Sequence, residues 1–490
     1  MKIWQKAGAL AIAASMMVGL AACGGGSAAP AATPTPEVKQ EVVVVDNNEA
    51  NTNDPYAIRT DANGNKIDLG GIEVVLNNWW EGEPTPPNNA YDEAREEYLD
   101  WLQKTYNFTF KRAQWSTWGD TPNDFNNYAM TGGDEYYMFT LRQGIEAAGS
   151  INQGLCWDLS KLDCLDFSDD KFDKAIMSYG KRGDSIYCMR AEVSEPRGGL
   201  YFNKRLLREA GIDPDSIYQL QEDGKWTWEE FEKMCETIKK DTDNDGVIDR
   251  WPMTNFASSF YDTVVASNHA KLIDVDADGN YISKIESNET LQAMNWAVEM
   301  RAKYEMPQPE GSNWDYMYAS FANGEAAFQT EEAYNAGQYI SNGMGDEFGF
   351  ACFPKGPNAD DYYSYSTDNL YVIPACYSQE KAWKIAFVYD LVTNDVPGYE
   401  GYPSWKYGYY NNFKDSEAVD LTLPRLMANA GPLFENSING LTGNDGLHGA
   451  LLWWNIVAVA SEDGGQQTPA ARAEAIRNTV QSYLDAANGK

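Results

Sequence analysis

Apolar and polar positions in the body of the chain follow strand and helix periods in turn. Short apolar runs predict four strands, at 72–80, 108–113, 136–141 and 185–190. Between the first two strands a helical period predicts a helix over 90–106, whose apolar face comprises Ala94, Tyr98, Trp101 and Leu102. This alternation predicts an α/β lobe with a mainly parallel sheet. Ligands of such sheets bind beyond the carboxyl ends of the strands.

A second helix is predicted to begin at Thr227. The Thr227 side chain suits an N-cap, and Glu230, three residues later, is its capping-box partner. Apolar residues then recur at helical spacing, at Phe231, Met234, Cys235 and Ile238. We therefore expect an amphipathic helix with this face buried.

The first 22 residues have the pattern of a secretory signal peptide. Lys2 and Lys6 lie at the start of an apolar run over 7–20 that is too short to span a bilayer, and small residues follow it. The Leu-Ala-Ala-Cys sequence that ends at Cys23 resembles the lipobox of bacterial lipoproteins, which implies that the Cys23 thiol is acylated. An ordinary signal peptide with an incidental cysteine is the alternative. We expect an exported, extracytoplasmic protein that a lipid anchors to the cell membrane.

The next segment, 23–55, is predicted to be the lipidated cysteine followed by a flexible linker. It is rich in Gly, Ala, Pro, Thr and Asn, and this composition buries too little apolar surface to offset the entropy of ordering. The body of the chain, 56–490, is too long for one ordinary core and suits two lobes.

The balance of charge excludes some classes of partner. The chain has 38 basic and 73 acidic residues, for a formal charge of −35. This charge opposes binding to nucleic acid or to an anionic membrane surface, because both need basic patches. Only two histidines occur, His269 and His448, so a histidine-based triad or zinc site is not expected.

Cysteine usage leaves two interpretations open. Besides Cys23 the chain contains Cys156, Cys164, Cys188, Cys235, Cys352 and Cys376. Export permits disulfides, and Cys156 and Cys164, which flank one short turn, are the pair to test first. Buried free thiols that pack as small apolar groups are the other interpretation.

Several motifs, taken in order, carry a family resemblance. GGLYFNKRLLREAGI at 198–212, followed by WTWEEFEKMCETIKK at 226–240, resembles the signature of extracellular solute-binding proteins of ABC importers, in the group similar to maltose-binding protein. Four further segments match in the same order: GEAAF at 324–328, FPKGP at 353–357, NLYVIP at 369–374 and KAWKIA at 381–386. Each motif alone is weak, and their shared order after a lipobox is specific.

The resemblance implies a two-lobe, type II periplasmic-binding-protein-like α/β fold that closes on a hinge around an interlobe ligand cleft. We expect the first lobe at 56–190 and 371–430, and the second at 191–370 and 431–490. It also implies a monomeric receptor that delivers its ligand to ABC permease subunits in the membrane, without catalytic residues of its own.

The aromatic content favours a carbohydrate ligand, with an oligosaccharide as the main expectation. The chain has 16 Trp and 30 Tyr, and sugar rings stack on aromatic planes while their hydroxyls bond to acids and amides. Aromatic and polar residues are mixed at 77–81, 313–316 and 407–412. Core packing is the alternative for most aromatic residues.

Candidate ligand-binding residues come from strand ends and from motif alignment. They are Trp79, Trp80, Asp134, Arg142, Glu192, Tyr334, Asp368, Asn369, Trp405, Trp453 and Trp454. Tyr334, six residues after Phe328, matches an aromatic platform of the sugar-binding family. Asp134 lacks the proline that precedes its counterpart in the family, and Trp405 also suits a packed surface loop. Trp79, Tyr334 and Trp453 are the strongest candidates.

One acidic loop resembles a calcium site. Its candidate ligands are Asp241, Asp243, Asp245, the Val247 carbonyl and Asp249, in EF-hand-like spacing. Pro252 stands where the bidentate glutamate belongs, and Asp-rich turns often only cap helices. Two similar segments, 274–279 and 61–65, are predicted to be turns, the first within a hairpin.

Other functions remain open. An exported glycoside hydrolase needs two carboxylates ~5–10 Å apart, a role that can be imagined for Glu192 and Glu331, although acids are abundant and no spacing singles out a pair. A surface sensor that imports nothing is another alternative. Within the solute-binding class, peptides or other polar solutes are also possible cargo.

Overall fold

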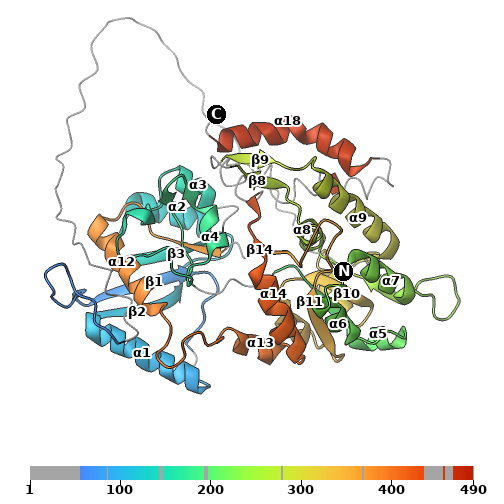
Figure 1. Cartoon of the computed structure of the whole chain (residues 1–490), viewed down its shortest axis with the longest axis horizontal. Coiled ribbons are helices and arrows are strands. Elements are labelled where there is room, and N and C mark those ends of the chain that lie inside the picture. Colours follow the sequence, from blue (N-terminus) through green and yellow to red (C-terminus); the bar gives the residue numbers. More distant parts are fainter. Residues whose placement is uncertain are drawn as a thin grey trace, which may run out of the picture. The chain divides into compact units, whose positions relative to one another are not determined.

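The computed structural model describes residues 56–434, except 85, 143–146, 192–196, 277–279 and 367–368, together with 456–457 and 467–488. Within these residues the chain forms two lobes, each built on a four-stranded sheet with helices packed on it (Figure 1). The expected α/β class is confirmed.

The first sheet has the order β13-β3-β1-β2. Its strands are β1 (Ile72–Asn78), β2 (Phe108–Gln114), β3 (Tyr136–Arg142) and β13 (Asn369–Val372). β1 is parallel to both β2 and β3, and β13 is antiparallel to β3. The predicted mainly parallel sheet is therefore confirmed, and its three parallel strands end at one edge.

Helices cover this first sheet. They are α1 (Ala90–Tyr106), α2 (Thr121–Thr131), α3 (Ala148–Asn152), α4 (Lys174–Tyr179) and α12 (Gln379–Val392), with a 3-10 turn, η3, at Leu159–Lys161. The Asn89 side chain caps α1 by accepting from the Asp92 amide at 2.9 Å, and α1 ends at Asn107 in the left-handed region. Tyr98 and Leu102 are buried, as predicted.

The strand predicted at 185–190 is wrong in length. The structure has a two-residue β5 (Ser185–Ile186) that pairs antiparallel with β4 (Lys181–Arg182). Met189 then forms only an isolated bridge with Tyr371. A hairpin satisfies these backbone groups locally, so the segment adds no strand to the main sheet.

The second sheet has the order β11-β6-β10-β7. Its strands are β6 (Gly199–Asn203), β7 (Trp251–Met253), β10 (Ala326–Glu331) and β11 (Phe348–Cys352). β6 is antiparallel to its neighbours β10 and β11, and β7 is parallel to β10. β6, β10 and β11 are buried along their whole length.

The helices of the second lobe pack around this sheet. They are α5 (Lys204–Glu209), α6 (Ser216–Glu222), α7 (Trp228–Ile238), α8 (Ala257–Ser267), α9 (Asn288–Tyr304), α10 (Tyr316–Ala322), α11 (Asn335–Ser341), α13 (Lys406–Asn412), the π-helical turn η4 (Ala418–Thr422), α14 (Leu423–Ala428) and α18 (Pro469–Ala487). Thr227 caps α7 by accepting from the Glu230 amide, and the predicted apolar face is buried. α18 contacts β9 and α9.

Two short strand pairs complete the second lobe. β8 (Ile273–Val275) and β9 (Tyr281–Ser283) form the antiparallel hairpin expected around 274–279. β12 (Ser364–Tyr365) pairs parallel with β14 (Ala430–Gly431). In the first lobe, the predicted turn at 61–65 is also present, with the Asp61 amide donating to the Asn65 carbonyl at 2.8 Å.

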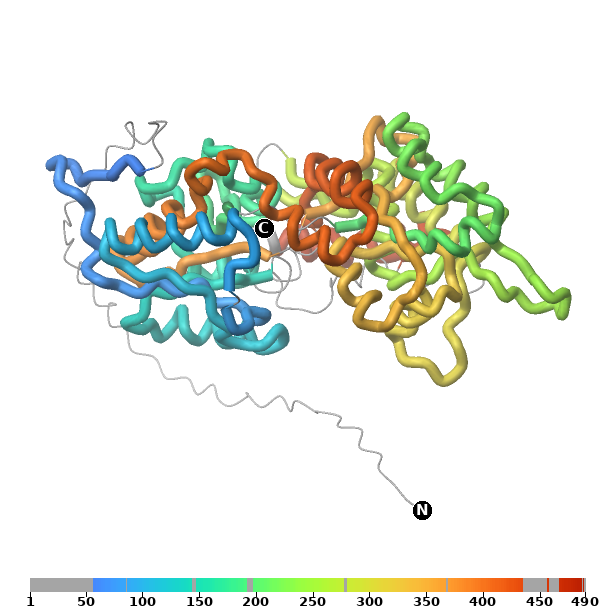
Figure 2. The backbone as a smooth tube through the Cα atoms, turned by 90° about the horizontal axis from the view of Figure 1, so that it is seen from below, coloured from blue at the N-terminus to red at the C-terminus, as the bar shows by residue number. Residues whose placement is uncertain are grey.

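The return segment expected in the first lobe, 371–430, is shorter in the structure. α12 packs in the first-lobe core, and the chain then runs through 393–405 to α13 (Figure 2). From Phe413 onward the apolar residues contact the second sheet, since Phe413 stacks on Tyr201 and Phe350 with ring centroids 6.0 and 5.4 Å apart. η4 and α14 also contact β11. The apolar side chains of this segment therefore cover the second sheet.

The six cysteines that the structure describes are free thiols, five of them buried. Cys156 and Cys164 belong to different core clusters, so they do not form the pair that the short turn suggested. Burial raises the pKa of Cys188 to about 12, which keeps this thiol protonated at neutral pH.

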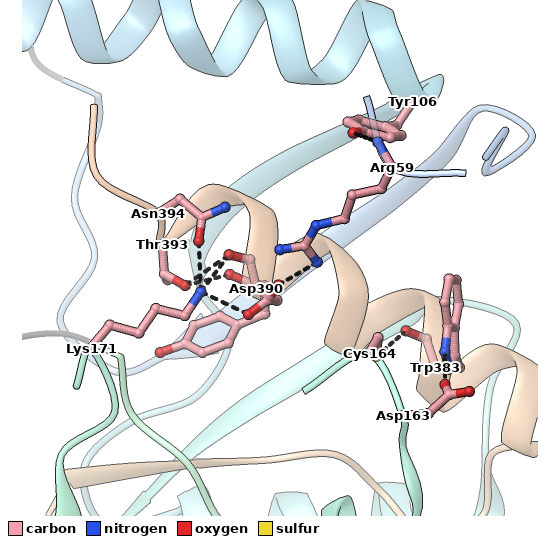
Figure 3. Close-up of polar contacts among 10 residues, drawn as sticks. Arg59, Tyr106, Asp163, Cys164, Lys171, Trp383, Asp390, Thr393 and Asn394 are labelled. Atoms are coloured by element: carbon pink, nitrogen blue, oxygen red, sulfur yellow. Dashed lines mark hydrogen bonds and ion pairs between the residues drawn. The ribbon is translucent and has the colours of Figure 1, made fainter. Parts of the chain in front are cut away.

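A cluster of ion pairs connects three distant parts of the first lobe (Figure 3). The Asp390 carboxylate is almost fully buried and binds the Arg59 guanidinium at 2.6 Å and the Lys171 ammonium at 2.7 Å. Lys171 also donates to the side chain of Asn394 at 2.8 Å. The Arg59 amide donates to the Tyr106 hydroxyl at 2.9 Å. The N-terminal end of the body, the loop before α4 and the end of α12 therefore meet at Asp390.

Replacing Asp390 by Asn should destabilise the protein by about 3 kcal/mol, because two largely buried cations lose their counter-charge. Urea unfolding measures the change. Asp100→Asn is the matched control, since Asp100 pairs with Lys104 at an exposed position and its loss should cost less than about 1 kcal/mol. Equal stability of the two variants would contradict the role given to Asp390.

Candidate functional site

The carboxyl end of β1 is shaped by two buried amides. The Asn78 Oδ1 accepts from the backbone amides of Trp80 and Glu81, at 3.0 and 2.7 Å, and its Nδ2 donates to the Glu81 carboxylate at 2.8 Å. Asn77 donates from Nδ2 to the Met138 carbonyl on β3 at 3.3 Å. These bonds turn the chain sharply after the strand and hold Trp79 and Trp80 at the sheet edge.

Aromatic rings and a guanidinium group gather at this edge. The rings of Trp79 and Trp80 meet edge to face, with centroids 4.8 Å apart. Arg142, at the end of β3, is 5% exposed, and its guanidinium carbon lies 5.7 Å from the centroid of Trp79. It lies 3.8 Å from the centroid of Trp118, in the turn after β2. Carboxyl ends of three parallel strands thus bring aromatic and charged groups together.

The register of β13 adds another predicted residue to this group. Asn369 is the partner of Arg142 across the antiparallel β13–β3 pair. Its carbonyl accepts from the Arg190 guanidinium at 3.0 Å. Trp79, Trp80, Arg142 and Asn369, four of the predicted ligand-binding residues, therefore lie at one edge of the sheet.

A second group lies at the carboxyl end of β10, in the other lobe. The buried Glu331 carboxyl accepts from the Tyr318 hydroxyl at 3.1 Å and from the Ser259 hydroxyl at 3.3 Å. Burial, with the charge of Glu332 beside it, raises the pKa of Glu331 to about 8. Glu332 itself pairs with Arg197 at 2.7 Å. Glu331 is therefore mostly neutral at pH 7, whereas Glu332 has a cationic partner.

Exposed aromatic rings lie close to this second group in the chain. Tyr334, three residues beyond Glu331, is 50% exposed and precedes α11. Trp314 is 69% exposed, and its ring centroid lies 5.8 Å from that of Phe256. An aromatic side chain beside a neutral carboxyl and an ion pair is suited to a polar ligand with an apolar face.

Two predicted residues do not join these groups. Asp134 is exposed and precedes β3, so it lies at the amino end of that strand, at the opposite edge from Trp79. Trp405 is half-buried and packs against Tyr409 of α13, with ring centroids 6.2 Å apart. The structure therefore contradicts Asp134 as a partner of Trp79 and favours the packed-loop interpretation of Trp405.

Four predicted ligand residues, Glu192, Asp368, Trp453 and Trp454, lie outside the described residues, as do Cys23 and the predicted signal peptide and linker up to residue 55. Sequence reasoning also missed Trp118 and the Arg197–Glu332 pair. Trp118 lies in the loop after β2, to which the strand-end argument applied to the second strand points, but the residue directly after that strand is Trp115, which packs on Phe139.

The predicted calcium loop brings three carboxylates together. Oxygens of Asp241, Asp243 and Asp249 lie within 4.8 Å of one another. The Asp241 carboxylate accepts from the amides of Asn244 and Gly246, at 2.6 and 2.8 Å, which curls the loop around it. Thr242 donates to Asp249 and lowers the pKa of that carboxyl. Three clustered hard oxygens fit the ligand preference of calcium.

Comparisons with known proteins agree with this two-lobed geometry. Residues 165–388 match the family model for bacterial extracellular solute-binding proteins. The fold is similar to that of a cyclic alpha-maltosyl-1,6-maltose binding protein from Arthrobacter globiformis, with 16% identity over 85% of this chain and 99% of that chain, and a TM-score of 0.59.

Two other solved structures share the fold. A cyclo/maltodextrin-binding protein complexed with maltotetraose has 14% identity over 84% of this chain and 97% of its own, with a TM-score of 0.55. UgpB from Mycobacterium tuberculosis, in complex with glycerophosphocholine, has 16% identity over 80% and 95%, with a TM-score of 0.55. No curated protein sequence matches the chain significantly. The family resemblance expected from the sequence is confirmed by the family match.

The raised pKa of Glu331 makes a prediction about stability. The unfolded chain ionises this carboxyl near pH 4.5, but the folded protein keeps its proton up to about pH 8. The ionisation of Glu331 in the unfolded chain therefore lowers the free energy of unfolding progressively as the pH rises between these values. Glu331→Gln removes this pH dependence, because glutamine does not ionise. Its stability relative to the native protein should therefore rise from pH 5 to pH 8, by at most about 1.4 kcal/mol per pH unit.

Urea unfolding at several pH values measures this difference. The exposed Glu325→Gln variant, at the other end of β10, is the control and should follow the native protein at every pH. A Glu331→Gln difference that stays constant with pH would contradict the neutral carboxyl.

Proposed function

This chain is a bacterial extracellular solute-binding protein, by the family that residues 165–388 match and by its two-lobed fold, and we propose that it captures a carbohydrate for an ABC importer. In this proposal an oligosaccharide binds in a cleft between the lobes, and the loaded protein delivers it to the permease subunits. The family is one of binding proteins located outside the cytoplasm, so the proposal needs no catalytic step.

The observation that carries the proposal is the group at the first sheet edge. Trp79 and Trp80 offer aromatic planes held in place by Asn78, and Arg142 and Asn369 lie beside them. Sugars need this combination, because their C–H faces stack on aromatic rings while their hydroxyls bond to polar groups. Tyr334, with Glu331 and Glu332, offers the same combination in the second lobe.

Comparison of the alternatives favours carbohydrate. Two of the similar structures are a cyclic alpha-maltosyl-1,6-maltose binding protein and a cyclo/maltodextrin-binding protein with maltotetraose, and a third is in complex with glycerophosphocholine, so polar non-sugar cargo stays an alternative. The hydrolase alternative needs two carboxylates placed around a glycosidic bond, and of its two named candidates the structure describes only Glu331, which is buried and accepts from Tyr318 and Ser259. A sensor role would use the same binding site and differ only in its membrane partner.

The N-terminal proposal follows from the sequence. Removal of 1–22 and acylation of Cys23 would leave a lipid anchor joined to the body by the linker to residue 55. In the described part of the chain, none of the helices has the length and apolar character to cross a bilayer. We expect a monomer outside the cell membrane.

We also propose a structural calcium ion at the loop of Asp241, Asp243 and Asp249, with Asp245 and the Val247 carbonyl as further ligands. The proximity of the three carboxylates supports this site. Bound calcium would neutralise the mutual repulsion of these acids and stiffen the turn between α7 and β7.

Glycan binding tests the main proposal. A thermal-shift and calorimetric panel of mono- and oligosaccharides should show one class that stabilises the protein and is recovered uncleaved. Trp79→Ala should weaken its affinity by about tenfold or more, because the stacking plane is lost.

Trp101→Ala is the matched control, since Trp101 is a half-buried tryptophan that stacks on Tyr98 of the same helix. It should change stability but not affinity. A panel without any shift would contradict carbohydrate cargo, and cleavage of the bound glycan would support the hydrolase.

Calcium binding is tested separately. Millimolar calcium should raise the melting temperature and a chelator should reverse the change. Asp243→Asn should abolish the shift, whereas Asp274→Asn, in the similar sequence of the β8–β9 hairpin, should keep it. A calcium effect that survives Asp243→Asn would place the ion elsewhere.

A further inference from the structure

We infer that Trp118 is a second sugar platform, which extends the site of Trp79 and Trp80 toward solvent and selects neutral glycans longer than a disaccharide. The inference rests on the proposed function, since it assigns a further contact to the same carbohydrate site. It concerns a residue that no sequence motif indicates.

The first observation is the fixed position of the Trp118 backbone. The residue lies in the turn that joins β2 to α2. The Thr117 hydroxyl donates to the Asp120 carboxylate at 2.7 Å, and the Thr121 amide donates to the Thr117 carbonyl at 3.1 Å. The turn therefore closes on itself around Trp118 and passes directly into a helix, which limits the movement of the ring.

The second observation is the cover on one face of the indole. The guanidinium carbon of Arg142 lies 3.8 Å from the ring centroid, which is van der Waals contact over the face of the ring. Trp118 is nevertheless 60% exposed. The exposed part must therefore include the opposite face, because the guanidinium occupies the first one.

A single exposed tryptophan is ordinary on a protein surface and needs no function. Trp118 differs because a nearly buried side chain holds it from behind. The ring is therefore preorganised, so a ligand that binds it loses less affinity to the entropy of orienting the side chain, as in a binding platform.

Trp118 also belongs to the site already described. The same guanidinium group contacts Trp79, which is half-buried, whereas Trp118 is mostly exposed. One short glycan can therefore reach both rings, with Trp79 and Trp80 as the inner contacts and Trp118 as the outer one. On this inference a disaccharide occupies the inner rings and a longer chain adds the outer ring.

The charges around Trp118 define the chemical class of the ligand. The Asp120 carboxylate is exposed two residues away, and Glu81 follows Trp80 at the neighbouring strand end. These acids accept hydrogen bonds from sugar hydroxyls and repel carboxylated or phosphorylated sugars. The Arg142 guanidinium, which contacts the ring, lies behind the indole rather than on its open face. The platform therefore suits neutral sugar rings.

Isothermal titration calorimetry on the mature protein tests the inference. The probes are the di- and tetrasaccharides of α-1,4-glucan, β-1,4-glucan, β-1,4-xylan and β-1,4-mannan. For the tetrasaccharide that the native protein binds, Trp118→Ala should weaken the affinity by about tenfold. The matching disaccharide should keep its affinity, and Trp118→Phe, which retains an aromatic plane, should keep most of the tetrasaccharide affinity. Because Trp118 is largely exposed, the melting temperature of the free variant should not change.

The outcomes distinguish a failure of the Trp118 platform from a failure of the proposed function. If the native protein binds one of these glycans and Trp118→Ala binds its tetrasaccharide equally well, the platform is wrong and the proposed function stands. Equal losses for the disaccharide and the tetrasaccharide would contradict the outer position. If the native protein binds none of the eight probes, the proposed function and the platform both fail.

Discussion

The buried carboxylate of Asp390 fixes the point at which the chain leaves the first lobe. Arg59 arrives there from the N-terminal end of the body and Lys171 from the loop before α4, and each is held by a separate oxygen of the carboxylate. The segment 393–405 begins three residues later, and Asn394 is bonded to the same lysine. Any movement between the lobes along this segment therefore has to be taken up beyond Asn394. Arg59, near the start of the described body, is tied to the same point.

The position of the site follows from the topology of the first sheet. Because β1, β2 and β3 are parallel, the residues that follow them meet at one edge although they are far apart in the sequence. The antiparallel β13 runs the other way, so its first residue, Asn369, reaches the same edge. Four separate segments thus supply one group of side chains, and no local motif contains it.

The predictable parts of the structure are those set by local physics. The periodicity and caps of α1 and α7 placed these helices correctly, and the strand ends placed Trp79 and Trp80. Asp134 was misplaced because a motif match took no account of strand direction, which puts this residue at the amino end of β3. The predicted extent of the segment that returns to the first lobe, 371–430, was too long for a related reason. The sequence shows that Phe413 is apolar, but only the tertiary structure shows which sheet it covers.

The contact between Trp118 and Arg142, at the site itself, is likewise not predictable from the sequence. The two residues are separated in the sequence by α2 and by most of β3, which ends at Arg142, and their contact depends on the packing of β2, α2 and β3 together. Nothing in the residue types around either position indicates a partner. Cation–π contacts of this kind are decided by side-chain geometry, so sequence patterns do not reveal them.

The charges in the two groups of site residues favour an uncharged ligand, despite the strong net charge of the chain. The Arg142 guanidinium lies against indole rings, Glu332 is paired with Arg197, and Glu331 keeps its proton at neutral pH because it is buried. The cationic charge in each group is therefore covered or paired. An anionic ligand would have to be desolvated without gaining a matching counter-charge, and the Glu81 and Asp120 carboxylates near the first group would repel it. A hydroxylated neutral ring loses less on leaving water, and the neutral Glu331 carboxyl, the Asn78 amide and the aromatic planes are the groups that interact with it.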